Sequence, residues 1–156
     1  GTLAAALSHR LKGSLLKPAA QVLVYPSLGG DYHQLESYQC NALAPLLTSD
    51  DIKFYRETRS APGDHPENDP EFYPLVAPDF TDLPITTCIS ADIDPLRDDS
   101  EEYCKKINLA GGSATWINEP GVTHDFIRAR HISERASDAF DDIITAINPK
   151  ARTKTR

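Results

Sequence analysis

The sequence is poor in the features that mark several classes of protein. It has no Met and only three Cys in 156 residues, and Cys40, Cys88 and Cys104 are too widely spaced for a zinc or disulfide framework, so reduced thiols and a cytoplasmic setting are favoured. No apolar run approaches the ~20 residues that cross a bilayer. Because 16 Lys and Arg face 23 Asp and Glu and form no basic stripe, we expect no nucleic-acid partner and no membrane span.

What remains is the composition of one globular domain. Apolar residues make up 40% of the chain and charged residues 25%, which are ordinary proportions for a domain with a buried core and exclude intrinsic disorder. Internal repeats and low-complexity tracts are absent. We therefore expect one domain over residues 1–150, followed by a solvated basic tail over 151–156.

Helical and extended patterns alternate along the chain. The spacing of apolar residues predicts helices over 2–12, 98–110 and 132–147, a shorter helix capped at Thr48 or Ser49, and strands over 21–25, 84–91 and 113–118. The first strand is mostly apolar, as in a strand buried on both faces of a parallel sheet. Residues 31–80 are rich in Pro and acidic residues, which indicates an excursion over the surface. The order predicts an α/β fold, with a mostly parallel sheet flanked by helices.

The same spacing predicts which side chains face the core. In the helix over 98–110 we expect Tyr103, Ile107 and Leu109 to be buried, with Asp98 as the cap of this helix. The last helix should bury one apolar face, formed by Ala136, Phe140, Ile143, Ile144 and Ile147. Aromatic residues near the strands are core candidates first; four of them could instead line a ligand pocket, namely Tyr25, Phe54, Tyr55 and Phe126.

Polar residues follow two of the predicted strands directly. Asp94 comes after the second strand and His124 after the third, 30 residues later. Since an intervening helix returns the chain to the same edge of a parallel sheet, the two side chains could meet there. A carboxylate that accepts the imidazole N–H would fix the ring and stabilise the imidazolium formed when the other nitrogen takes a proton from a nucleophile. Asp92 is better explained as a structural residue.

Two motifs at these positions give a specific resemblance. Asp94-Pro95-Leu96-Arg97-Asp98 and Gly121-Val122-Thr123-His124-Asp125-Phe126 resemble the C-terminal half of the hormone-sensitive-lipase-like (fold-3) branch of α/β-hydrolase esterases and lipases. The resemblance implies that Asp94 is the acid and His124 the base of a catalytic triad, and that the excursion over 31–80 is part of a helical cap. Asp125 stands where that family usually has Gly.

The resemblance also gives the opening residues a meaning. Gly1 to Ala6 look like the helix after the family's nucleophile elbow, which implies a serine three residues upstream of Gly1 and oxyanion donors in a missing N-terminal half. None of the serines in the chain has a Gly-x-Ser-x-Gly context. We therefore expect a serine carboxylesterase of short to medium acyl esters as the intact parent, without cofactor or metal, and a 156-residue chain inactive alone. The first strand should then have an unpaired edge, and a homo-oligomer is possible.

Other interpretations of the same residues stay open. Asp92 and Asp94 in an Asp-x-Asp arrangement could serve a Mg²⁺-dependent phosphatase, although no Gly-rich or Lys-bearing phosphate cradle accompanies them. The chain could also be a non-catalytic α/β-hydrolase module whose excursion binds a partner. A metal site formed by Asp92, Asp94, His124 and Asp125 lacks zinc-ligand spacing.

Overall fold

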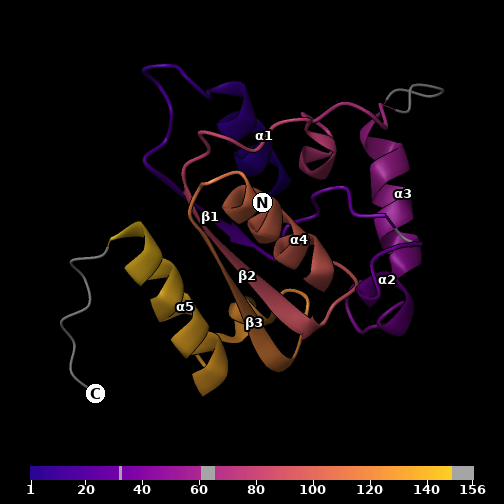
Figure 1. The fold of residues 1–156 in the computed structure, drawn as a ribbon. Coiled ribbons are helices and arrows are strands. Elements are labelled where there is room, and N and C mark those ends of the chain that lie inside the picture. Colours follow the sequence, from indigo (N-terminus) through magenta and orange to yellow (C-terminus); the bar gives the residue numbers. More distant parts are fainter. Residues whose placement is uncertain (32, 61–65, 149–156) are drawn as a thin grey trace.

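A three-stranded parallel sheet organises the chain (Figure 1). The computed structural model describes residues 1–31, 33–60 and 66–148. The tail expected over 151–156 and part of the Pro-rich excursion lie outside these ranges. The strands are β1 (Ala20–Val24), β2 (Ile85–Ile93) and β3 (Ala114–Thr123), in the spatial order β1-β2-β3. Both pairs are parallel, as the sequence predicted.

Helices cover both faces of the sheet (Figure 1). On one face, α1 (Thr2–Arg10) and α4 (Arg97–Leu109) pack against the strands, with Tyr103 and Ile107 wholly buried over Leu23 and Cys88. On the other face, α5 (Glu134–Ile147) packs against β1, and its buried Ala136 and Ala139 share a core cluster with Ile89 and Ala91 of β2. Burial of apolar surface on both faces is the main force that holds such a layered sheet together.

The excursion between β1 and β2 contains α2 (Ser37–Cys40), α3 (Ser49–Arg59) and the short 3₁₀ helix η1 (Pro74–Val76). The predicted cap of α3 is confirmed: the Thr48 hydroxyl accepts from the backbone N–H of Asp51, and the Asp51 carboxylate accepts from the Thr48 N–H. A small cluster of Tyr38, Leu47 and Ile52 joins this region to Leu96 at the start of α4. The excursion is thereby attached to the edge of the sheet where β2 ends.

Several boundaries and faces differ from the prediction. β3 continues through Pro120 and Gly121 to Thr123, where we expected a loop. This is possible because β3 lies at the edge of the sheet that the described strands form, and Pro120 falls at the register shift, so its missing N–H costs no ladder bond. Leu109 is 79% exposed, and α5 leaves Ile144 and Ile147 exposed. In each of these helices the buried positions are those that the sheet reaches, and periodicity alone does not fix how far the covered stripe extends.

β1 pairs only with β2 among the described residues, so its outer edge has no partner there. This agrees with the expected unpaired edge. The expected burial on both faces is only partial: Gln21 and Leu23 are buried, Val22 and Val24 are half-buried, and Ala20 is exposed. In α1 the apolar Leu3 and Leu7 are exposed, and the small Ala5 and Ala6 are buried instead. Within the described ranges no helix combines the length and apolarity that a bilayer span needs.

Candidate active site

Asp94 and His124 meet at the edge of the sheet where β2 and β3 end. Ile93 and Thr123, the last residues of the two strands, are register partners, so the next residue of each strand emerges at the same edge. A register shift between Ala91 and Ile93 lets the longer β3 finish level with β2. The His124 Nδ1 lies 2.7 Å from the Asp94 Oδ2, a distance typical of a charge-assisted hydrogen bond.

The acid is buried and fixed by its own loop. Asp94 is 0% exposed, and its second carboxylate oxygen, Oδ1, accepts from the backbone N–H of Leu96 at 2.9 Å. Both oxygens of this side chain are therefore used, one by the loop and one by the histidine. A carboxylate held in this way can accept the Nδ1–H of a neutral imidazole, which leaves Nε2 free to take a proton.

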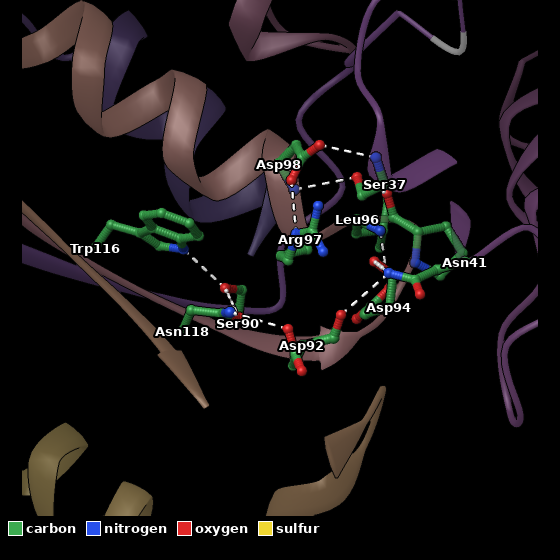
Figure 2. Close-up of polar contacts among 11 residues, drawn as sticks. Ser37, Asn41, Ser90, Asp92, Asp94, Leu96, Arg97, Asp98, Trp116 and Asn118 are labelled. Carbon is green, nitrogen blue, oxygen red and sulfur yellow. Dashed lines mark hydrogen bonds and ion pairs between the residues drawn. The ribbon is translucent and has the colours of Figure 1, made fainter. Parts of the chain in front are cut away.

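A brace from the excursion holds the acid loop, and sequence reasoning missed it (Figure 2). The Asn41 side-chain amide donates to the backbone carbonyls of Asp92 at 3.1 Å and Asp94 at 3.2 Å. One turn earlier, the Ser37 hydroxyl donates to the carbonyl of Pro95 at 2.6 Å. Ser37 and Asn41 belong to α2 and its C-terminal end, a four-residue helix too short to show a periodic pattern, so no signal in the sequence pointed to them.

Asp98 does not cap α4, contrary to our expectation. The N-cap is Leu96, whose N–H is bound by Asp94. Asp98 lies inside the first turn, where its carboxylate pairs with Arg97 at 2.7 Å and accepts from the backbone N–H of Ser37 at 2.8 Å (Figure 2). The acidic residue predicted as a cap thus belongs to the brace between α2 and the acid loop.

Asp92 ties β2 to β3 through contacts separate from the Asp94–His124 bond. Its carboxylate accepts from the Asn118 amide and from the backbone N–H of Gly121, both at 3.3 Å. The polar contacts continue through Ser90 to the indole N–H of Trp116, which donates to Ser90 at 2.7 Å (Figure 2). In the part of the chain that the structure describes, no group of three or more His, Cys, Asp and Glu side chains could hold a metal ion.

The histidine lies on a tighter and more exposed turn. Its side chain is 20% exposed, and the next residue, Asp125, has a φ of 65°, a left-handed conformation that Gly and, less often, Asp adopt. Asp125 pairs with Arg128 at 3.2 Å in the short helix η2 (Phe126–Ala129). The turn therefore keeps the left-handed geometry that suits a glycine, with an acidic residue in that place.

Tyr25 supports the other side of the imidazole. Its ring centroid lies 4.6 Å from that of His124, and its own φ of 33° marks a strained backbone at the end of β1. Burial, followed by the negative charge of Asp125, raises the pKa of Tyr25, so its hydroxyl stays protonated at neutral pH. Among the described residues, the His124 side chain has one hydrogen-bond partner, Asp94.

A cleft of about 340 Å³ lies beside the pair, a size at the lower end of small-molecule sites. Of the four aromatic residues proposed as pocket candidates, Tyr25 and Tyr55 line it and Phe54 and Phe126 do not. Its walls come from the N-terminal end of α1, the segment after β1, and α3, with His124 at one side. The arrangement can hold a small molecule beside an imidazole whose partner carboxylate is buried.

The segment after β1 is fixed by a second buried carboxylate. Asp99 on α4 accepts from the backbone N–H groups of Leu28 at 2.6 Å and Gly30 at 3.3 Å, and from the Tyr38 hydroxyl at 2.9 Å. Burial raises its pKa to about 6, although the nearby charge of Arg56 acts in the opposite direction. A Cβ at Gly30 would meet Asp99 at 2.0 Å, so only glycine allows this close approach.

Comparison with known proteins shows which family the chain resembles. A family model described as the alpha/beta hydrolase fold matches residues 1–128. The chain is 29% identical over 150 residues to the ethyl acetate hydrolase of Pseudomonas putida. This alignment covers 94% of this chain and 46% of that protein. It is 29% identical to the arylesterase of Saccharolobus solfataricus, over 88% of this chain and 44% of that one.

Solved structures agree. The hyperthermophilic esterase from the archaeon Pyrobaculum calidifontis superimposes with a TM-score of 0.85 at 26% identity, over 96% of this chain and 50% of that one. The chain thus spans about half the length of the curated relatives and solved structures that it matches.

Proposed function

Since the chain belongs to the hormone-sensitive-lipase-like branch of the α/β-hydrolase fold family, we propose that Asp94 and His124 are the acid and the base of a serine carboxylesterase. The observation that carries the proposal is the 2.7 Å contact between the His124 Nδ1 and the buried Asp94 carboxylate at the ends of adjacent strands. It fits the nucleophile–acid–histidine order of this fold, in which the acid and the histidine follow the serine in the chain.

In the proposed mechanism a serine hydroxyl attacks the ester carbonyl while His124 Nε2 takes its proton. The imidazolium then gives this proton to the leaving alkoxide, so the alcohol departs and an acyl-enzyme remains. Water repeats the sequence: His124 removes its proton, the hydroxide oxygen attacks the acyl carbon, and the serine oxygen leaves with the proton. Asp94 stays ionised and stabilises the imidazolium in both halves.

The serine and the oxyanion donors are proposed to come from a segment outside these 156 residues. Gly1 and Thr2 line the same cleft as His124, so a residue shortly before them in the chain would lie at this cleft. The same segment would pair with the open edge of β1, and residues 31–80 would form part of the cap over the site. Short and medium acyl groups suit the size of the cleft, and the similar protein from P. putida is named for ethyl acetate.

All three cysteines are free thiols, which supports a reducing compartment such as the cytoplasm.

The experiment compares the 156-residue chain with the whole protein on p-nitrophenyl butyrate. The whole protein should hydrolyse the ester with burst kinetics typical of an acyl-enzyme, and a phosphonate ester should inactivate it covalently. The chain alone should do neither. Turnover by the chain alone would refute an external nucleophile, and an inactive whole protein that binds neither ester nor phosphonate would refute the esterase.

A further inference from the structure

The cleft beside His124 differs in charge from the rest of the molecule. The chain carries a net charge of −7, yet the described residues that line the cleft include two arginines, Arg56 and Arg59, and no Asp or Glu. A neutral ester needs no cation in its pocket. The charge of this lining therefore bears on which ester the site accepts.

Both arginines come from one face of α3. Ile52, Tyr55, Arg56 and Arg59 follow each other at the i, i+3, i+4 and i+7 positions that share a side of a helix, and all four line the cleft. Ile52 is buried in the cluster with Leu47 and Leu96, which fixes the rotation of the helix. The wall thus changes along its length from an apolar residue, through a tyrosine, to a cationic end.

The two arginines are engaged differently. Arg56 is half-buried and donates to the Gly30 carbonyl at 3.2 Å and to the Tyr38 hydroxyl at 2.7 Å, next to the buried Asp99 whose pKa its charge lowers. These contacts give Arg56 a role in holding the segment after β1.

Arg59 is exposed, and its guanidinium donates to the carbonyl of Phe72 and lies over the ring of Phe72 at 5.2 Å. Within residues 1–31, 33–60 and 66–148, no carboxylate lies within the 4.0 Å of an ion pair with Arg59. A guanidinium held over an aromatic ring keeps further N–H donors in a planar fork that matches a carboxylate.

We propose that the site prefers esters that carry a second, free carboxylate, and that Arg59 binds this carboxylate while His124 serves the ester. The inference rests on the proposed esterase function and names its substrate class. The carboxylate could belong to the acyl part, as in a half-ester of a dicarboxylic acid, or to the alcohol part; both offer Arg59 the same group.

The test uses pairs of esters that differ by one terminal carboxylate. Monoethyl glutarate and ethyl pentanoate differ on the acyl side, and 3-acetoxypropanoate and propyl acetate differ on the alcohol side. Hydrolysis by the whole protein is followed in a pH-stat, and kcat/KM of each anionic ester is divided by that of its neutral partner. We expect this ratio to exceed 1 for one pair, which identifies the side, and to fall when the salt concentration is raised.

Substitutions of Arg59 then test whether this residue causes the preference for the anionic ester. Arg59→Gln should lower the ratio about three- to tenfold, mainly through the KM of the anionic ester, and should leave kcat/KM of the neutral ester within about twofold. Arg59→Lys should restore part of the ratio because the charge remains and the fork is lost. Arg10→Gln is the matched control: it removes the same charge from an exposed arginine of α1 that pairs with Glu71, and it should leave the ratio unchanged.

The outcomes separate this inference from the proposed function. If neutral esters are hydrolysed but the ratio exceeds 1 for neither pair, or if Arg59→Gln and Arg10→Gln have equal effects, the preference for anionic esters is refuted and the proposed esterase function stands. If no ester is hydrolysed, the proposed esterase function is refuted. Calorimetric titration with glutarate then tests the anion site separately. Glutarate binding that becomes weaker in Arg59→Gln supports the site, and absence of glutarate binding refutes it.

Discussion

The two halves of the Asp94–His124 pair are supported in opposite ways. Asp94 is wholly buried, both of its oxygens are hydrogen-bonded, and its loop is braced by Ser37 and Asn41. His124 is partly exposed, has one hydrogen-bond partner among the described residues, and precedes a residue with a positive φ. The acid is fixed by many polar contacts, whereas the base is held by one bond and an aromatic ring.

This difference suits the proposed chemistry. A carboxylate that must stay ionised and aligned gains from donors fixed before the reaction, because no reorganisation is then needed when the imidazolium forms. The imidazole must instead exchange protons with groups in the cleft, so one nitrogen has to remain accessible. The comparison predicts that replacing the Asp94 carboxylate lowers kcat strongly. Substitutions of residues that surround His124 should lower kcat by smaller factors.

The largest effect should follow from Asp94→Asn in the whole protein. The amide cannot accept the Nδ1–H as an ion and favours the wrong imidazole tautomer, so we expect kcat for p-nitrophenyl butyrate to fall by about 10³- to 10⁴-fold with little change in KM.

Asp92→Asn is the control two residues earlier, at the end of β2, because Asp92 contacts Asn118 and Gly121 instead of His124. Its loss in kcat should stay below about tenfold. Similar losses for the two variants would mean that loop structure, and not the Asp94 charge, supports the activity.

The brace provides the next test. Asn41→Ala removes two hydrogen bonds to the carbonyls of Asp92 and Asp94. We expect kcat to fall about tenfold and the free energy of unfolding to decrease by about 1–2 kcal/mol. Asn108→Ala is the matched control, since the Asn108 side chain also makes two bonds to backbone groups, both of Ala114, away from the cleft.

Asn108→Ala should destabilise the protein by a similar amount and keep kcat. Equal losses of kcat in both variants would show that stability, and not alignment of the acid loop, explains the result.

The sequence predicted the parallel α/β order, the cap of α3 and the strand-end placement of Asp94 and His124, because each rests on local patterns and on a rule of parallel connection. It did not predict the brace from Ser37 and Asn41, the buried Asp99 contacts, or Asp98 outside the cap. These depend on where the excursion over 31–80 returns to the sheet, which is long-range information. The same reason explains Leu109, whose spacing fits a core position that the sheet does not reach.

The histidine side is tested by two substitutions of Tyr25. Tyr25→Leu removes the ring that lies 4.6 Å from the imidazole, and we expect kcat to fall about three- to tenfold through a less ordered His124. Tyr25→Phe keeps the ring and should retain most of kcat. If Phe is as damaging as Leu, the hydroxyl beside Asp125 and not the ring supports the histidine. NMR detects the ring contact through the shift of the His124 ring protons.

The smallest effect concerns stability and comes from Asp99, which belongs to the acid-side helix but holds the segment that follows Tyr25. Its pKa is about 6 in the fold because of burial, against 3.8 for an ordinary Asp. Between these values the folded state binds more protons than the unfolded state, so the contribution of Asp99 to the unfolding free energy rises as the pH falls from 7 to 4, by at most about 1.4 kcal/mol per pH unit.

His9 acts in the opposite direction over the same window. Burial lowers its pKa to about 4 from 6.5, so the unfolded state takes up the proton first and stability is lost as the pH falls. Wild-type unfolding curves alone would therefore show a partial cancellation. The difference in Tm between the wild type and Asp99→Asn removes the His9 contribution, because both proteins contain it. We expect this difference to move in favour of the wild type by a few degrees between pH 7 and pH 5; a constant difference would mean that Asp99 is not protonated in the fold over this range.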